Sequence, residues 1–298
     1  MPAPAPDLIE SHLTITTEPN QHIPALILKS KTAKPGPLPV VIVLHGTGGK
    51  KEDELQLLEM LARAGMIAVG PDARYHGERS AEGHGTKTYY AAVAKAYADG
   101  RSHPWLYDEV FDWMRLIDYL QTRPDIDPHR IGLIGISKGG METYLTAAVD
   151  PRVAVAVPCI CLQSFRWELD NNRWHGRIGT VQGAFNAAAA QSGASPTDPA
   201  FVQHFYDRVV PGITSEFDCP AMLKLIAPRP MLAISGERDP INPLPCAQIA
   251  ADAARQAYAQ AGEPDHFKFI IEKGAAHQVT LASKEAAVSW FSRWLNAK

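Results

Sequence analysis

The sequence lacks several features that would assign it to whole classes of protein. It has 32 acidic and 29 basic residues, a net charge of −3, and the basic residues are scattered along the chain. Nucleic acid and anionic membranes bind surfaces on which positive charge is concentrated, so we expect neither partner. The chain also has no run of about 18 apolar residues, so we predict no membrane-spanning helix.

Targeting, disulfide and metal-binding signals are also missing. Residues 1–7, rich in proline and alanine, have no basic or apolar region of a signal peptide, so we expect a cytoplasmic protein with a flexible tail over residues 1–11. The four cysteines show no CxxC pairing and are too few for a disulfide scaffold, so we expect reduced thiols. No HExxH motif or other compact ligand spacing occurs, and we expect no metal.

What the sequence does contain is the alternation of strands and helices typical of an α/β fold. Two strands at 12–17 and 22–28 form a predicted antiparallel hairpin, after which continuous apolar runs alternate with helical segments. A mostly parallel, doubly wound sheet with an antiparallel N-terminal edge follows from this order. The predicted strands are 40–44, 66–69, 131–136, 153–157, 231–234 and 267–271, and the predicted helices are 52–64, 108–122, 139–148, 246–261 and 281–296.

Two segments, 73–107 and 160–228, interrupt this alternation. In a doubly wound sheet, insertions after strand ends lie over the carboxyl edge, where ligands bind. We therefore predict one domain over residues 12–298, with residues 160–228 forming a small helical cap over the site.

The strongest motif is Gly-Ile-Ser-Lys-Gly at residues 135–139, between a predicted strand and a predicted helix. This is the setting of a nucleophile elbow, in which a strained turn exposes a serine at the top of the sheet. Glycines two residues to either side let the strand and the helix approach closely. Ser137 is the predicted nucleophile, and the N–H of Lys138 is the predicted first donor of an oxyanion hole. The Lys138 side chain is expected in solvent, paired loosely with Glu142.

A glycine-rich loop, His-Gly-Thr-Gly-Gly at residues 45–49, follows the strand at 40–44. Its backbone N–H groups can stabilise developing negative charge, and the Thr47 N–H is the predicted second oxyanion donor, with Gly48 as the alternative. Such loops also bind phosphate, but neither GxxxxGK[ST] nor GxGxxG is present. We expect His45 to have a structural role.

A nucleophilic serine needs a histidine base and an acid that orients it. Asp239 lies in a polar turn after the strand at 231–234, with Glu237 as the alternative acid, and His277 lies in the loop after the last strand. The order Ser, Asp, His is that of the α/β-hydrolases. We therefore predict that Ser137, Asp239 and His277 form a catalytic triad.

Four stretches, 45–49, 71–79, 125–137 and 227–239, resemble the dienelactone hydrolase and acetyl xylan esterase group of α/β-hydrolases, over roughly residues 12–297. The resemblance implies an α/β-hydrolase fold and ester hydrolysis by Ser, His and Asp, without metal or organic cofactor. Dienelactone hydrolases proper have a cysteine where this chain has Ser137, so their specific reaction is not implied.

Aromatic residues are concentrated in the predicted cap. Phe165, Trp167 and Trp174 are candidate substrate-binding residues, because ligand pockets are mostly apolar, although they and Phe185 equally suit a small core of the cap itself.

The function predicted from the sequence is hydrolysis of a small carboxylic ester with a short or acetyl acyl group. A peptidase or amidase of the same fold is one alternative, and a hydrolase-fold binding protein without turnover is another. The oligomeric state and the natural substrate stay open.

Overall fold

The first two strands, β1 (Leu8–Glu18) and β2 (Gln21–Ser30), form an antiparallel hairpin. The computed structural model describes residues 5–296. The hairpin is confirmed, but β1 begins earlier than predicted. Leu8 is buried and pairs with Ser30, so the predicted tail over residues 1–11 is wrong for its last four residues. Residues 1–4 of that predicted tail lie outside the described residues.

The hairpin is the edge of an eight-stranded sheet with the order β1-β2-β4-β3-β5-β6-β7-β8. Strand β2 runs antiparallel to β4, and the pairs from β4 through β8 are parallel. The predicted parallel sheet with an antiparallel N-terminal edge is therefore confirmed. The remaining strands are β3 (Leu38–Leu44), β4 (Ile67–Pro71), β5 (Ile126–Ile136), β6 (Val153–Cys159), β7 (Met231–Gly236) and β8 (Phe267–Glu272).

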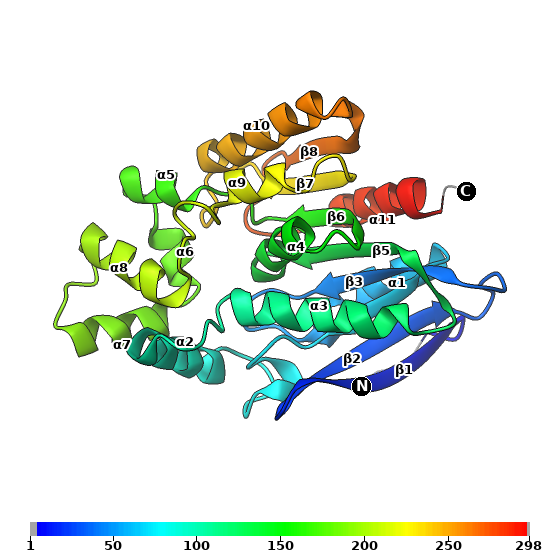
Figure 1. Cartoon of the computed structure of the whole chain (residues 1–298), viewed down its shortest axis with the longest axis horizontal. Coiled ribbons are helices and arrows are strands. Elements are labelled where there is room, and N and C mark those ends of the chain that lie inside the picture. Colours follow the sequence, from blue (N-terminus) through cyan, green and yellow to red (C-terminus); the bar gives the residue numbers. More distant parts are fainter. Residues whose placement is uncertain (1–4, 297–298) are drawn as a thin grey trace.

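Helices cover both faces of this sheet (Figure 1). On one face, α1 (Leu55–Arg63), preceded by the short helix η1 (Lys51–Glu54), and α11 (Leu281–Leu295) bury Leu57 and Phe291 in one apolar cluster. On the other face, side chains such as Trp113 and Met141 belong to a second, larger cluster. The helices there are α3 (Tyr107–Gln121), α4 (Lys138–Val149) and α10 (Leu244–Gln260).

The predicted cap is helical and lies at one end of the sheet (Figure 1). Its helices are α5 (Phe165–Asp170), α6 (His175–Gly179), α7 (Gln182–Ser192) and α8 (Pro199–Val209). Helix α9 (Cys219–Lys224) packs on α4 and α10, beside the sheet. The buried cap residues belong to the same apolar cluster as α3 and α4, so the cap shares its core with the sheet layer.

One cap-facing helix was not predicted. Helix α2 (Lys87–Asp99) lies in the interrupting segment 73–107 and packs against α7 and α8. It buries Tyr89, Val93, Ala96 and Tyr97, and Tyr97 stacks on Phe205 of α8 with ring centroids 5.8 Å apart. Part of its buried surface is therefore covered by a segment far away in the sequence. Two short 3-10 helices complete the elements, η2 (Gly77–Arg79) and η3 (Pro264–His266).

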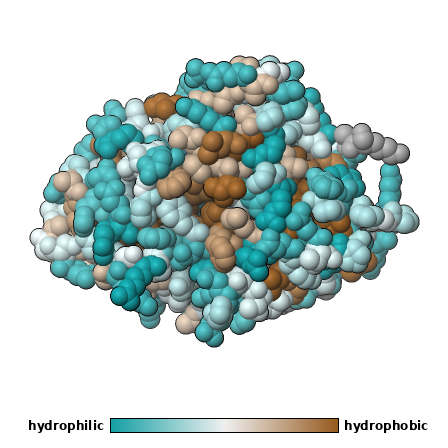
Figure 2. Space-filling model, viewed as in Figure 1, coloured by the Kyte–Doolittle hydropathy of each residue, from teal (hydrophilic) through white to brown (hydrophobic). Residues whose placement is uncertain are grey.

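The surface in Figure 2 is mostly hydrophilic, with hydrophobic residues gathered at the middle of that face, over α4 and α9. Val149 at the end of α4 and Leu225 just after α9 are among the exposed apolar residues. Within residues 5–296, every helix is too short or too polar to cross a bilayer.

Candidate active site

Ser137 occupies a sharp turn between β5 and α4. Its backbone has φ 57° and ψ −111°, a strained conformation for a residue with a side chain. A Cβ on Gly135 would collide with the backbone of Gly139, and one on Gly139 would collide with the carbonyl of Leu44. The close approach predicted from the two flanking glycines is therefore confirmed, and it fixes Ser137 at the carboxyl edge of the sheet.

His277 and Asp239 reach this serine from two other loops of the same edge. The Ser137 Oγ lies 2.8 Å from His277 Nε2, and His277 Nδ1 lies 2.8 Å from Asp239 Oδ2. His277 lies between β8 and α11, and Asp239 follows β7. With Nδ1 donating to the carboxylate, Nε2 is free to accept the serine proton, which is the arrangement a general base requires.

Asp239 lies in a turn that stabilises its charge. Burial would raise its pKa, but hydrogen bonds from His277 and from the N–H groups of Ile241 and Asn242 outweigh burial and lower it. A carboxylate that stays ionised can orient an imidazole and stabilise its protonated form. The alternative acid, Glu237, is exposed and accepts a hydrogen bond from the Gly274 N–H instead.

The two residues predicted to supply oxyanion N–H groups, Lys138 and Thr47, both lie near Ser137. Lys138 is the first residue of α4, so its N–H has no acceptor within the helix. Thr47 lines the cavity that contains Ser137 and His277. His45 has the structural role expected: its Nδ1 donates to the Gly46 carbonyl and its Nε2 accepts from the Ala73 N–H.

The cavity beside Ser137 has a volume of about 640 Å³. It mixes apolar side chains with hydroxyl groups from several elements, as ligand pockets do. Most of its walls could not be predicted from the sequence, although Thr86 and Tyr90 lie in the segment 73–107 that interrupts the alternation of strands and helices, and Gln278 adjoins His277. Its further lining residues include Thr86, Tyr90, Ile160, His175, Thr180, Ile241 and Gln278.

Known proteins share this architecture. Residues 23–164 match the Dienelactone hydrolase family. YtaP of Bacillus subtilis (strain 168), which carries the name of a hydrolase, is 25% identical and is aligned over 95% of this chain and 87% of its own. YitV of the same organism, named as an esterase, is 25% identical over 92% of this chain and 96% of its own. The solved acetyl xylan esterase from Paenibacillus sp. R4 is 19% identical, with a TM-score of 0.69 over 99% of this chain and 87% of that one.

The chain has the α/β-hydrolase fold. Its residues 23–164 match the dienelactone hydrolase family, and relatives named as a hydrolase and an esterase align with nearly its whole length. The resemblance, the fold and the enzyme class predicted from the sequence are confirmed.

The cap aromatic residues of this α/β-hydrolase do not line the cavity beside Ser137. Phe165 is fully buried and packs edge-on against Tyr206, with ring centroids 5.4 Å apart. Trp174 is buried and stacks on His175, and Trp167 is part-buried outside the cavity. This cavity does not support their prediction as substrate-binding residues. Phe165 and Trp174 belong to the apolar core that the cap shares with the sheet layer, and Trp167 lies outside both that core and the cavity.

The prediction of a solvated Lys138 is also wrong. Its side chain is fully buried, and Nζ lies 2.6 Å from Glu109 and 2.5 Å from Glu142. Burial would lower the pKa of Lys138, but the two carboxylates raise it. Glu142 also accepts a hydrogen bond from the Trp113 indole. The start of α4 in the α/β-hydrolase domain is therefore anchored by a buried ion pair.

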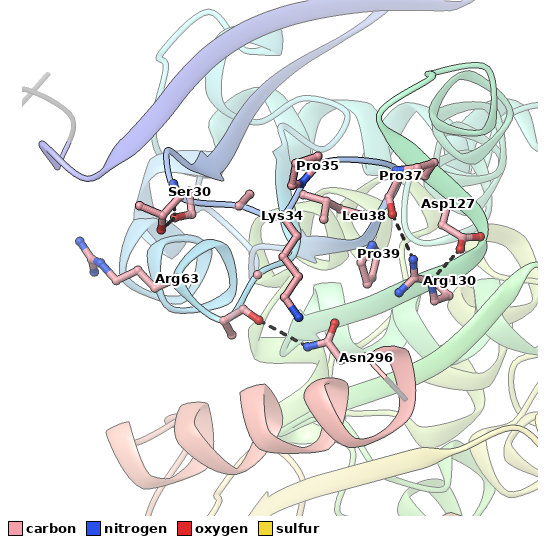
Figure 3. Close-up of a pocket in the computed structure, with 14 residues that line it drawn as sticks. Ser30, Lys34, Pro35, Pro37, Leu38, Pro39, Arg63, Asp127, Arg130 and Asn296 are labelled. Atoms are coloured by element: carbon pink, nitrogen blue, oxygen red, sulfur yellow. Dashed lines mark hydrogen bonds and ion pairs between the residues drawn. The ribbon is translucent and has the colours of Figure 1, made fainter. Parts of the chain in front are cut away.

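A cavity of about 780 Å³ lies at the opposite edge of the sheet (Figure 3). It is lined by the starts of β3 and β5 and the end of α1, including Leu38, Asp127 and Arg63. None of the predicted site residues lies there, and ligands of doubly wound sheets bind at the carboxyl ends of the strands. Within residues 5–296, no group of three His, Cys, Asp or Glu residues is arranged to hold a metal ion. All four cysteines are buried and free.

Proposed function

We propose that this α/β-hydrolase is a serine esterase that cleaves small carboxylic esters through an acyl-enzyme on Ser137. The observation that supports it most is the continuous pair of 2.8 Å contacts from the Ser137 hydroxyl through His277 to Asp239. A hydroxyl at neutral pH is a poor nucleophile unless a base removes its proton, and this arrangement supplies that base.

In the proposed reaction, Ser137 Oγ attacks the ester carbonyl while His277 Nε2 takes its proton. Asp239 orients the imidazole and stabilises its positive charge. The N–H groups of Thr47 and Lys138 hold the oxyanion of the tetrahedral intermediate. His277 then gives the proton to the leaving alcohol, and a water activated by the same imidazole hydrolyses the acyl-enzyme and regenerates Ser137.

The volume and the lining of the cavity indicate which class of substrate it can accept. Its volume of about 640 Å³ accommodates a small ester, and the hydroxyl groups of Thr86, Tyr90 and Thr180 offer hydrogen bonds to an oxygen-rich substrate. The loop at residues 45–49 lies close to the elbow, since a Cβ on Gly46 would lie 3.6 Å from the Ser137 Cβ, and this proximity favours a short acyl group such as acetyl. We therefore propose acetylated or other short-chain small esters as the substrate class.

Two measurements test the proposal. A fluorophosphonate probe should label the wild-type chain and fail to label Ser137→Ala, and p-nitrophenyl acetate should be hydrolysed only by the wild type. Matched p-nitroanilides should be cleaved much more slowly than the esters. An unlabelled wild type would refute the enzyme mechanism, and faster anilide cleavage would favour an amidase.

A further inference from the structure

The cap contacts the loop that carries the triad acid at Gly176 of α6. We call residues 237–242, which follow β7, the acid turn. A Cβ on Gly176 would lie 2.5 Å from the Pro240 carbonyl oxygen and 2.9 Å from the Ile241 Cα, so the helix backbone lies directly against the acid turn. The same helix contributes His175 and Gly179 to the wall of the cavity. Any movement of α6 therefore affects the cavity and the acid turn together.

The next residue of α6, Arg177, extends into the interior. Its side chain is 1% exposed, its Nε donates to Gln163 Oε1 at 2.8 Å, and its Nη2 donates to Asn242 Oδ1. These two acceptors are neutral amides. Burying a guanidinium is costly without strong partners, so a fully buried arginine that contacts the acid turn indicates a role beyond packing.

Asn242 links Arg177 to the triad acid. Its Nδ2 lies 3.2 Å from Asp239 Oδ2 and 2.7 Å from the Ile160 carbonyl oxygen, and its backbone N–H donates to Asp239 Oδ1 at 3.0 Å. Arginine can only donate hydrogen bonds, so it requires the amide oxygen of Asn242 to face it. The amide nitrogen then necessarily faces Asp239 and Ile160, which can only accept. Arg177 thus fixes the orientation in which Asn242 supports the carboxylate.

We propose that Arg177 and Asn242 are positioning residues for Asp239, through which the docked cap holds the acid in its working geometry. This inference rests on the proposed function, because it assigns Asp239 the task of orienting His277. It also gives the cap a second role, since the cap both walls the cavity and completes the support of the triad.

Other titratable groups share the surroundings of Arg177. They lie close enough for the charge of Arg177 to act on their pKa values and include Glu168 of α5, Cys161 after β6, Cys246 of α10, Tyr144 of α4, Tyr206 of α8, Cys219 of α9 and Tyr89 of α2. Burial raises the pKa of Glu168 to about 8 even though Arg177 opposes the rise. Arg177 is therefore a positive charge among groups that are mostly neutral at pH 7, and its removal makes protonation nearby easier.

The test compares Arg177→Met and Asn242→Ala with wild type in ester hydrolysis across pH. Because small displacements of a catalytic group are costly, kcat should fall by about tenfold to 100-fold in each variant, with KM nearly unchanged. The acid limb of kcat/KM should move to higher pH in both, since one variant loses a nearby cation and the other loses a donor that shares the charge of Asp239. Arg177→Lys keeps the charge but not the forked contact, so its kcat should fall while its acid limb stays in place.

Arg173→Met is the matched control, because Arg173 is an exposed arginine of the same cap. The charge lost is the same, but solvent and salt screen it, so kcat and the acid limb should match wild type. Fluorophosphonate labelling and thermal unfolding report whether each variant is folded. An unchanged kcat in Arg177→Met, or a lower kcat with an unmoved acid limb, would overturn the proposal and leave Arg177 a packing residue.

Failure of the proposed function gives a different result. If the wild-type chain neither hydrolyses esters nor reacts with the probe, the esterase proposal fails, and the positioning role is tested by NMR titration of the His277 imidazole. His277→Gln assigns the signal. The titration midpoint should be higher in Arg177→Met and Asn242→Ala than in wild type, and equal midpoints in all three would overturn the inference independently of activity.

Discussion

The carboxyl edge of the sheet and the cap differ in what determines the positions of their side chains. At the sheet edge, Ser137, Asp239 and His277 arrive from three separate loops and meet within hydrogen-bonding distance. In the cap, Phe165 and Trp174, two of the aromatic residues proposed from the sequence as substrate contacts, are buried in the core that the cap shares with the sheet layer. The edge is fixed by backbone topology, whereas the cap is fixed by the packing of side chains.

This difference has a physical cause. Parallel strands in register bring the loops at their carboxyl ends to one edge, so residues far apart in the chain meet whatever their side chains are. A helix of the cap has no comparable constraint from a sheet. Which of its faces is buried depends on neighbours such as α2, which ends about 80 residues before α7 begins.

The sharpest test of the sheet edge is Asp239→Asn. An asparagine keeps the shape of the acid but allows the imidazole to adopt the wrong tautomer, and we expect kcat on p-nitrophenyl acetate to fall about 10⁴-fold at pH 7. The control is Glu237→Gln, which changes an exposed carboxylate two residues earlier in the same turn and should leave kcat unchanged. Similar losses in both variants would mean that the turn, rather than the carboxylate of Asp239, is what matters.

Lys138→Met tests a position at the sheet edge where the structure departs from the prediction. Removing the ammonium leaves Glu142 buried without its cation, so the free energy of unfolding should fall by about 3–5 kcal/mol. Chemical denaturation measures this, with the exposed Lys95→Met as control, expected within about 0.5 kcal/mol of wild type. The double variant Lys138→Met with Glu142→Gln should recover part of the loss. A fully stable single variant would mean that the pair is not the anchor of α4.

The same contrast sets the limit of what the sequence predicts. The parallel sheet with its antiparallel edge, the elbow and the loop positions of Ser137, Asp239 and His277 could be predicted, because hydrophobic periodicity and motif position determine them locally. The burial of Lys138 could not, since its partner Glu109 lies 29 residues earlier in α3, a separation at which spacing carries no signal. The role proposed for Asn242 could not be predicted either, because it depends on a contact with Arg177, which lies 65 residues earlier in the chain.

Phe165→Ala tests whether the cap aromatic residues are core rather than binding residues. The ring is fully buried against Tyr206, so its removal should lower the free energy of unfolding by about 3–5 kcal/mol. Trp167→Ala, at a part-buried position outside the cavity, should cost less, and neither change should alter KM for small esters. Thr180→Val, in the cavity wall, should alter KM with little effect on stability. A large rise in KM for Phe165→Ala would restore it as a substrate contact.

Glu168 makes the stability of the cap depend on pH, and the sign follows from its burial. Burial raises its pKa from 4.5 to about 8 in the folded chain. Between these values the unfolded carboxyl has lost its proton while the folded one retains it, so the folded state binds more protons and is destabilised as pH rises. This group should lower the free energy of unfolding by at most about 1.4 kcal/mol per pH unit over that range.

Denaturation at several pH values should therefore give a shallower decline of the free energy of unfolding for Glu168→Gln than for wild type, whereas the exposed Glu285→Gln should follow wild type. Parallel curves for all three would mean that Glu168 is ionised in the folded cap, with Arg177 close enough to neutralise it.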